Sequence, residues 1–480
     1  MGNTGVSGES GMSVTEIGFL DSLLAAATPD AQSQQDSHNV RLKKQRASAL
    51  ERALSLSVPT TRDEDWRFTD LSPLYRLKLK PYATDGKVDP AIFKTLCFPE
   101  AAVRLVFVDG RFDSAASCGV TGDGSVSESA ISEGTVSEGA ASKNAASDGV
   151  MVANLQHVLA DEAWQGVRDS LEDHLTSIAD FEKDVFAAAN TAYLQDAAVV
   201  HVAAGCGLDA TPIQILNVST GHETAASPRL LIVAERNARC TVIEDYVAVG
   251  GTAYLTNSVC EIFVAPNAEV NHIKLQREAE TAFHIGNTSV RMEADSRYRN
   301  WSVATGGKIS RHNLNVYQRG VGIDCEMNGL ALTAGRQLAD THSYIDHALP
   351  HGNSRQVHKT ISGGSAHAVF NGKIMVREGA QQTNSSQQSR NMLLSPRASV
   401  DTKPQLEIFA DDVKCAHGAT VGQVDAEEIF YLKSRGLSET DARNLLVYAF
   451  AAEVVSRVPV GSLVAVLESQ ILEQTRNKEV

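Results

Sequence analysis

Short apolar runs separated by turn residues dominate the middle of the chain. Across residues 198–424 these runs end at Gly, Asn or Pro, as in AVVHVAAG, NSVCEIFVAPNA and VFNGKIMVREGA. Runs of this length bounded by turn residues are typical of buried strands. The pattern also repeats loosely, because residues 232–238 are echoed by residues 263–268, and residues 328–333 by residues 371–376. Such repeats indicate a solenoid, and since only strands and tight corners are available, they predict a β-helix or stacked β-roll.

A β-sandwich is the alternative architecture for a chain so rich in strands. It would need tight hairpins, and the core contains few two-residue hairpin signals. We therefore place a β-helix core at residues 196–424.

The N-terminal region before the core, residues 13–195, is predicted to be mostly helical. Residues 13–27, 39–56 and 161–195 carry apolar side chains at helical spacing. The run AVRLVFVD, residues 102–109, is the exception and predicts a buried strand.

A small helical lobe, residues 425–480, is predicted after the core. Asp425 with Glu428 has the form of a capping box, Gly436 ends that helix, and Ser438 begins the next one. Because the end of a solenoid needs a cap to hide its last coil, we expect this lobe to cover that end.

Two segments carry too few apolar side chains to fold by themselves. Residues 113–150 consist mainly of Ser, Gly, Ala and acidic residues, in near-repeats such as SVSES and TVSEG. Such a composition buries too little surface to offset the entropy of ordering. We expect an inserted flexible loop there, with an acidic interaction segment as the alternative, and a disordered tail over residues 1–12.

Charge and cysteine usage narrow the possible partners. The 480 residues carry a net charge of −15 at pH 7, which argues against nucleic acid because its binding needs a basic face. No apolar run approaches the roughly 18 residues of a membrane span, and the first residues match neither a secretory signal nor a transit peptide. The seven cysteines are odd in number and scattered, which fits a reducing compartment. We therefore expect a cytoplasmic protein.

Two kinds of catalytic site find little support in the sequence. The Gly-Gly-Lys sequence at residues 306–308 is followed by Ile309 and lacks the earlier glycine of a P-loop, so any ATP-dependent step needs a partner. A β-helix enzyme that cleaves polysaccharides needs paired carboxylates about 5 to 10 Å apart. Asp411 and Asp412 are adjacent, and we expect them to form a turn. We therefore do not expect them to provide such a pair.

Late in the core, a cysteine and a histidine share one face of a predicted strand. Cys415 and His417 follow the alternation that begins at Val413, so both should point the same way, roughly 7 Å apart. A thiolate and an imidazole at that distance can meet one metal centre, although two residues do not complete a site. Alternatively, Cys415 is a small buried residue and His417 a hydrogen-bonded one. Gly418 and Gly422 are expected to break this strand.

Histidines are concentrated in the same part of the chain. Half of the 14 histidines lie there, namely His312, His342, His347, His351, His358, His367 and His417. One interpretation is a metal-binding or iron-holding face. The other is polar ladder packing and hydrogen bonding along a subunit contact, because histidine ligands need convergent partners that spacing cannot show.

Three segments resemble one known family. The run DTKPQLEIFADDVKCAHGATVGQVDAEEIFYLKSRGL, residues 401–437, closely resembles the C-terminal signature of the SufB/SufD family of iron–sulfur cluster assembly proteins. The segment from Asp340 to Arg355 is similar to the one before the last coils of that family. Residues 59–69, PTTRDEDWRFT, resemble a motif near the start of its SufD branch, and Trp66 there is expected to be a packed anchor. The resemblance implies a right-handed parallel β-helix, in agreement with the periodicity.

By this resemblance the chain is expected to be a non-catalytic scaffold subunit. It would pair with a SufB-type subunit through the β-helix core and dock the SufC ATPase through residues 425–480, with a homodimer as the alternative assembly in the absence of SufB. The implied cofactor is a transient iron–sulfur cluster or iron at the subunit interface. His417 is the ligand that the resemblance favours, since imidazole suits iron. Cys415 is the weaker candidate, with Lys414 and His417 expected to favour its thiolate. A SufB-like cluster scaffold and a β-helix carbohydrate-active enzyme are the alternatives.

Overall fold

The computed structural model describes most of the chain. It covers residues 12–25, 40–80, 88–101, 103–118, 149–160, 164–208, 211–221 and 223–476. The tail expected over residues 1–12 lies outside these ranges except for Met12, and the loop expected over residues 113–150 lies outside them except for residues 113–118 and 149–150.

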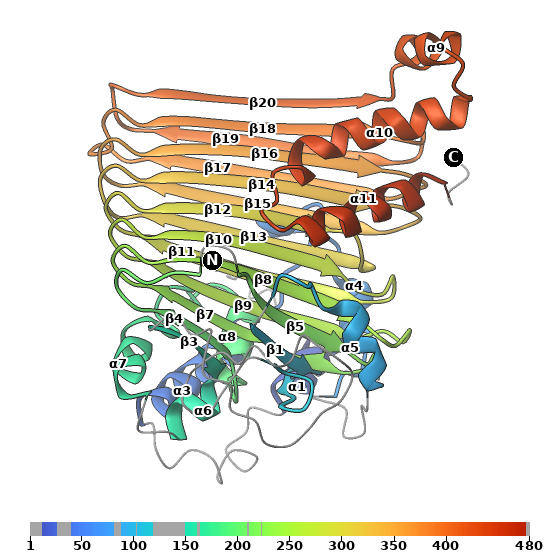
Figure 1. The fold of residues 1–480 in the computed structure, drawn as a ribbon. Coiled ribbons are helices and arrows are strands. Elements are labelled where there is room, and N and C mark those ends of the chain that lie inside the picture. Colours follow the sequence, from blue (N-terminus) through green and yellow to red (C-terminus); the bar gives the residue numbers. More distant parts are fainter. Residues whose placement is uncertain are drawn as a thin grey trace, which may run out of the picture.

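Two sheets face each other and form a solenoid (Figure 1). Their strands are parallel except for the antiparallel pairs β1–β2 and β3–β4. Strands join the two sheets alternately, so that each coil of the chain adds one strand to each. The first sheet contains β2 (Arg111–Phe112), β1 (Val103–Val108), β5 (Ile213–Ser219), β8 (Arg239–Ala248), β10 (Glu269–Arg277), β12 (Arg297–Ala304), β14 (Asp324–Thr333), β16 (Asn353–Ser362), β18 (Asn384–Leu393) and β20 (Lys414–Gln423). The second contains β3 (Val150–Asn154), β4 (Ala198–Val202), β7 (Arg229–Ala234), β9 (Leu255–Val264), β11 (Phe283–Met292), β13 (Ile309–Gln318), β15 (Leu338–His347), β17 (His367–Val376) and β19 (Ser399–Ile408), with β6 (Ala225–Ala226) beside β9. The predicted β-solenoid is confirmed.

The chain turns from the second sheet to the first at a stack of similar corners. Asn237, Asn267 and Asp295 occupy this corner in successive coils, with φ of 62°, 61° and 57°. Asn and Asp tolerate this left-handed conformation better than other residues with a side chain. The backbone N–H of Asn237 donates to the carbonyl of Pro266 at 3.2 Å, and that of Asn267 to Ala294 at 3.0 Å. Each corner is thus hydrogen-bonded to the next one.

The two echoes in the sequence have different structural origins. The first echo joins equivalent parts of neighbouring coils, because residues 232–238 and residues 263–268 each form the end of a second-sheet strand and the corner after it. This echo therefore reflects the coil repeat of the solenoid. Residues 328–333 belong to β14 in the first sheet, whereas residues 371–376 belong to β17 in the second. The second echo is therefore not a coil repeat.

The space between the sheets has an apolar half and a polar half. The apolar half is one continuous cluster that includes Val200, Ile232, Val264, Val290, Val316 and Ile345. The polar half contains buried side chains that include Lys274, His284, His312, Gln356 and His358. The solenoid therefore encloses charged and hydrogen-bonding groups that need partners inside the protein.

Glycines provide the room for the polar side chains. A Cβ atom at Gly329 would lie 2.3 Å from Nδ1 of His358, and one at Gly372 would lie 2.2 Å from Nε2 of Gln387. Real Cβ atoms do not approach other atoms so closely. These strand positions require glycine because of this close approach.

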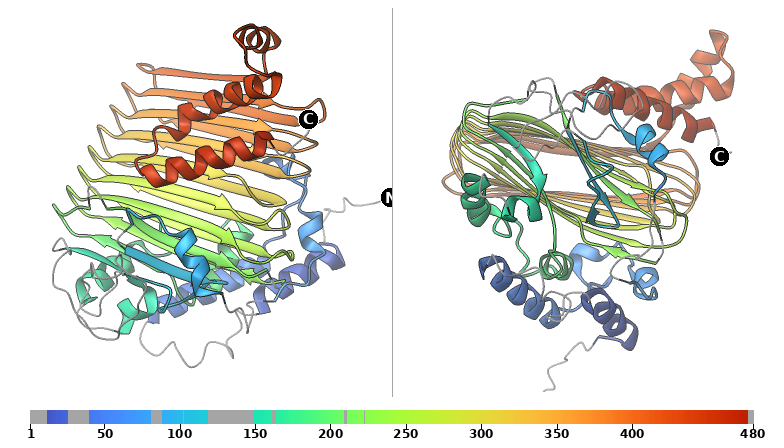
Figure 2. Two further views of the ribbon diagram at one scale, coloured as in Figure 1. Left: turned by 45° about the vertical axis from the view of Figure 1, so that its right-hand side comes forward. Right: turned by 60° about the horizontal axis from the view of Figure 1, so that its bottom comes forward.

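Helices of the N-terminal region surround the lower coils. They are α1 (Val14–Leu24), α3 (Val40–Ser55), α4 (Ser72–Tyr75), α5 (Pro90–Leu96), α6 (Leu155–Ala160), α7 (Gln165–His174) and α8 (Val185–Ala192) (Figure 2). The region also supplies β1, β2 and β3 to the sheets, so strand pairing begins before residue 196. Trp66 is an anchor as expected, because Arg311 lies over its ring at 3.8 Å and Phe186 lies 5.8 Å away.

The single helical segment expected over residues 161–195 is wrong. Two helices, α7 and α8, are separated by an irregular connection in which Thr176 has φ of 63°. The buried carboxylate of Glu261 on β9 accepts the backbone N–H groups of Thr176, Ile178 and Ala179 at 2.8 to 2.9 Å. These bonds hold the connection out of the helical conformation, and the spacing of apolar residues could not reveal them.

The C-terminal helices do not cap the solenoid, contrary to expectation. They are α9 (Ala426–Ser434), α10 (Glu439–Val455) and α11 (Gly461–Arg476), and α10 and α11 lie along the side of the first sheet (Figures 1 and 2). Val447 and Val454 of α10 pack with Leu330 and Val357 of that sheet. The amino group of Lys359 donates to the carbonyl of Phe450 at 2.7 Å. The lobe therefore packs on the apolar outer face of the first sheet rather than on the open end of the solenoid.

We predict that Gly329→Ala destabilises the fold, because the new methyl group displaces the buried ring of His358. Overpacking of this kind costs about 1 to 3 kcal/mol. Gly422→Ala is the matched control, since it also lies in the first sheet and nothing lies within 4 Å of its Cβ position. Urea unfolding measures both variants, and equal stability of the two would contradict the packing argument.

Candidate functional site

The last coil of the solenoid is open. Its strands, β19 and β20, are the edge strands of the two sheets, and no strand among the described residues pairs with their outer sides. Large apolar side chains are exposed there, with Ile408 40%, Phe409 63% and Val421 47% accessible. An exposed strand edge with apolar side chains is a template for pairing with another chain.

Cys415 and His417 lie on this open coil. Their register partners on β18 are Ser385 and Gln387, whose side chains are buried inside the solenoid. Cys415 and His417 therefore share the inward-facing side of β20, as the alternation predicted. Cys415 is half-buried and packs with a small cluster around Ile374, whereas His417 is exposed.

Two expectations about this strand are wrong. Partial burial raises the pKa of the Cys415 thiol, so its surroundings do not favour the thiolate. The strand also continues through Gly418 and Gly422 to Gln423. Pairing with β18 along its whole length keeps these glycines extended. Asp425 then caps α9, as predicted, but it accepts the N–H of Glu427 rather than the N–H of Glu428 that a capping box would use.

The other crowded histidines do not form one face. Inside the solenoid, His312 hydrogen-bonds Thr288 at 3.0 Å, His347 hydrogen-bonds Ser354 at 2.9 Å, and His358 packs on Phe370. His342 and His367 instead pair with Asp340 and Asp401 at 3.0 and 2.7 Å, and His351 occupies a corner with φ of 63°. This arrangement favours polar packing and hydrogen bonding over a single metal-binding face.

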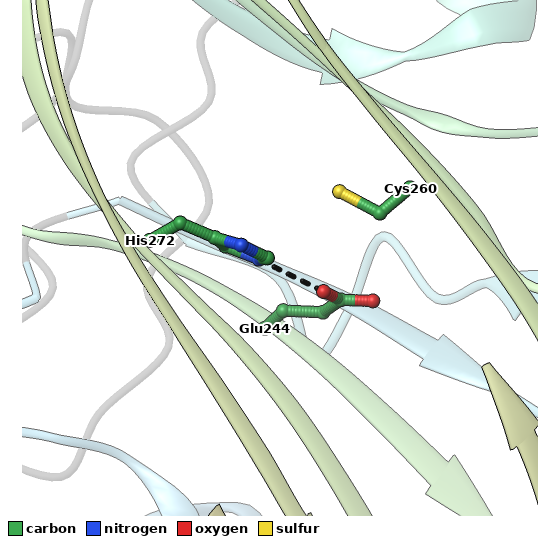
Figure 3. Close-up of side chains that lie close together, drawn as sticks. All are labelled: Glu244, Cys260 and His272. Carbon is green, nitrogen blue, oxygen red and sulfur yellow. Dashed lines mark hydrogen bonds and ion pairs between the residues drawn. The ribbon is translucent and has the colours of Figure 1, made fainter. Parts of the chain in front are cut away.

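A buried group of three side chains with metal-ligating atoms lies deeper in the solenoid. Glu244 on β8, Cys260 on β9 and His272 on β10 each place one such atom within 4.8 Å of the other two (Figure 3). It is the one group of this kind among the described residues. Its three residues lie on separate strands, so no spacing pattern predicts the group, although Glu244 inside the apolar run CTVIEDYVAVG is a signal that points to it.

Hydrogen bonds and ion pairs hold this group in place. Oε2 of Glu244 lies 2.9 Å from Nε2 of His272, and Oε1 lies 3.2 Å from Nζ of Lys274. Tyr246 also donates its hydroxyl to Oε1. Burial alone would raise the pKa of the Glu244 carboxyl, but Lys274 and His272 lower it well below its ordinary value. Burial, with a smaller contribution from Glu244, raises the pKa of the Cys260 thiol well above its ordinary value.

The described ranges of the chain contain no helix that is long and apolar enough to span a membrane.

Comparison with known proteins identifies two matching family regions. Residues 217–450 match the SufBD core domain of SUF-system FeS cluster assembly proteins, and residues 107–215 match the SufBD protein N-terminal region. Together they cover most of the chain.

Several curated proteins are similar over most of their length. An iron–sulfur cluster assembly SufBD family protein of Synechocystis is 38% identical, with 88% of each chain covered. The iron–sulfur cluster assembly protein SufD of Escherichia coli is 33% identical over 84% of this chain and 86% of its own. The chloroplastic protein ABCI7 of Arabidopsis thaliana is 32% identical over 95% of this chain and 89% of its own.

We predict that two buried histidines make the fold sensitive to mild acid. Burial lowers the pKa of His358 to about 3, and burial lowers that of His347 to about 4. The unfolded imidazole titrates at about pH 6.5, so below that pH the unfolded chain binds more protons than the folded one. The free energy of unfolding is therefore highest above pH 6.5. At pH 5 the loss is on the order of 2 kcal/mol per histidine.

Urea unfolding at pH 7 and pH 5 measures this loss. His358→Gln should lose less stability between the two pH values than the original chain, by on the order of 2 kcal/mol. His417→Gln, at an exposed position, is the control and should keep the original difference. An unchanged pH dependence in His358→Gln would show that His358 is not held neutral by burial.

Proposed function

The chain belongs to the SufBD family of SUF-system iron–sulfur cluster assembly proteins, and from this premise we propose that it is a non-catalytic scaffold subunit of the SufD type. It pairs with a SufB-type subunit through the open coil of the solenoid and docks the SufC ATPase through its C-terminal helices. A transient iron–sulfur cluster or iron ion is held at the shared interface. The proposed location is the cytoplasm.

The open coil is the observation that carries the proposal. The edges of β19 and β20 offer unpaired backbone groups, and the exposed Ile408, Phe409 and Val421 offer apolar surface. A homologous solenoid with a similar open end can pair with these edges by strand addition. A second copy of this chain has the same edges, so a homodimer is the expected state when no SufB-type subunit is present.

The position of His417 supports its role as an interface ligand. It is exposed on the inward-facing side of β20, at the coil where a partner strand would add. The neutral imidazole suits iron, and the partner subunit would complete the ligand set. Cys415 lies beside it on the same side of the strand, but its thiol must lose a proton before it can bind iron.

The C-terminal helices offer a separate docking surface for SufC. None of the side chains of α9 is buried, and this helix stands away from the sheets (Figure 1). Phe430 and Tyr431 are 74% and 56% accessible, and Leu445 of α10 is 45% accessible. Large exposed aromatic side chains are typical anchors of protein–protein contacts.

We predict that a charge introduced on one docking surface abolishes binding of the partner at that surface only. Val421→Lys places a charge on the open coil, and the complex should lose the SufB-type subunit while keeping SufC. Phe430→Asp places a charge on α9, and the complex should lose SufC while keeping the SufB-type subunit. Co-purification with a tagged chain and its two partners measures both, and each variant is the control for the other. Loss of both partners from either variant would contradict two separate surfaces.

We predict that His417→Ala lowers cluster formation on the assembled complex several-fold without loss of SufB or SufC. Stability should change by less than about 0.5 kcal/mol, as is usual for an exposed position. Anaerobic reconstitution followed by absorption spectroscopy and iron analysis measures the cluster. His201→Ala, on β4 at the other end of the solenoid, is the control. An equal cluster yield in His417→Ala would remove this residue from the mechanism.

A further inference from the structure

The buried group of Glu244, Cys260 and His272 lies far from the open coil and has no part in the function proposed above. We propose that these three side chains bind one divalent transition-metal ion, Zn²⁺ or Fe²⁺, inside the solenoid. This inference does not depend on the scaffold role.

The geometry brings the three side chains together from both sheets. Glu244 and His272 come from neighbouring strands of the first sheet, β8 and β10, and Cys260 comes from β9 on the opposite side of the interior. Figure 3 shows the side chains converging on one small region. Their ligand atoms all lie within 4.8 Å of one another, and bonds of about 2.0 to 2.3 Å to one shared ion need only small side-chain movements.

The donor set is one that such ions use. Thiolate, imidazole and carboxylate are the protein ligands of zinc, and three of them leave a fourth position for water. Imidazole and thiolate also suit iron, whereas Mg²⁺ and Ca²⁺ prefer sites made of oxygen ligands. The chemistry therefore excludes those two hard cations as the preferred occupants.

Neighbouring residues orient two of the ligands. Lys274 and Tyr246 hold Oε1 of Glu244, which leaves Oε2 facing His272. On the other side of the imidazole, Nδ1 lies 3.0 Å from the hydroxyl of Tyr298. In the tautomer whose Nδ1–H donates to Tyr298, Nε2 can bind a metal ion in place of its contact with Oε2 of Glu244. A second hydrogen bond of this kind is what usually fixes a metal-binding histidine.

A metal ion would replace protons in this group. The 2.9 Å contact between Nε2 of His272 and Oε2 of Glu244 shares one proton, and the free Cys260 thiol carries another. An ion that binds all three ligand atoms takes the place of both protons. The ion would then link the two sheets at this level of the solenoid.

The test uses the full chain and Co²⁺ as a spectroscopic substitute for Zn²⁺ or Fe²⁺. Because the three side chains are at most 1% accessible, the ion must enter as the chain folds. The chain is therefore unfolded and refolded under reducing, anaerobic conditions with Co²⁺. We expect one Co²⁺ per chain, a thiolate-to-cobalt charge-transfer band, and a higher melting temperature than without metal. Metal analysis of the freshly purified protein shows which ion it holds.

Matched variants separate this site from other possibilities. Cys260→Ser should lose the charge-transfer band and the bound ion. Cys325→Ser should keep both, because Cys325 is equally buried in the same interior but lies outside the group. The double variant Cys415→Ser/His417→Ala should also keep both, which excludes the open coil as the source of the signal.

Two results would overturn the proposal. One is a refolded chain that binds no Co²⁺ and contained no metal when purified. The other is a Cys260→Ser variant with an unchanged cobalt spectrum. If Cys260→Ser does not fold, X-ray absorption of the cobalt-loaded double variant decides the question, because the proposal requires a cobalt–sulfur bond there. Absence of that bond means that Glu244, His272 and Lys274 form only a buried ion-pair network.

Discussion

Parallel backbone pairing from coil to coil governs this molecule. Each strand is hydrogen-bonded to the strands of the previous and the next coil, and the corners at Asn237 and Asn267 are hydrogen-bonded to the corner of the next coil as well. A buried backbone group without a partner costs free energy, so every coil needs a neighbour. The last coil, β19 and β20, has none among the described residues. The exposed strand edges of this coil are therefore a direct consequence of how the core is built.

The same stacking places polar side chains inside the protein. Inward-facing positions of successive coils lie directly above one another, so Glu244, Lys274 and His272 meet within a water-poor interior. There, charges must be paired and long side chains need space. Glycines such as Gly329 provide that space. The buried metal-ligating group and the acid-sensitive histidines have this common origin, and both lie away from the surfaces proposed for partners.

Much of the fold could be predicted from local pattern. Short apolar runs predicted the strands, the residues around Asn237 and Asn267 predicted a coil repeat, and Asp425 and Ser438 predicted helix starts that the structure confirms. Predictions failed where a distant group decides the local conformation. Glu261 holds Thr176 out of a helix, β18 keeps Gly418 in a strand, and the apolar side of the first sheet draws Val447 away from the open end.

The sequence by itself determined the solenoid, the family, and the shared strand face of Cys415 and His417, because strand alternation and a long continuous motif are local properties. Only the tertiary structure decided which coil stays open, where the C-terminal helices lie, and that Glu244, Cys260 and His272 meet. The last three come from separate strands on two facing sheets. Their encounter depends on the register between coils and on the distance between sheets, which no single stretch of sequence specifies.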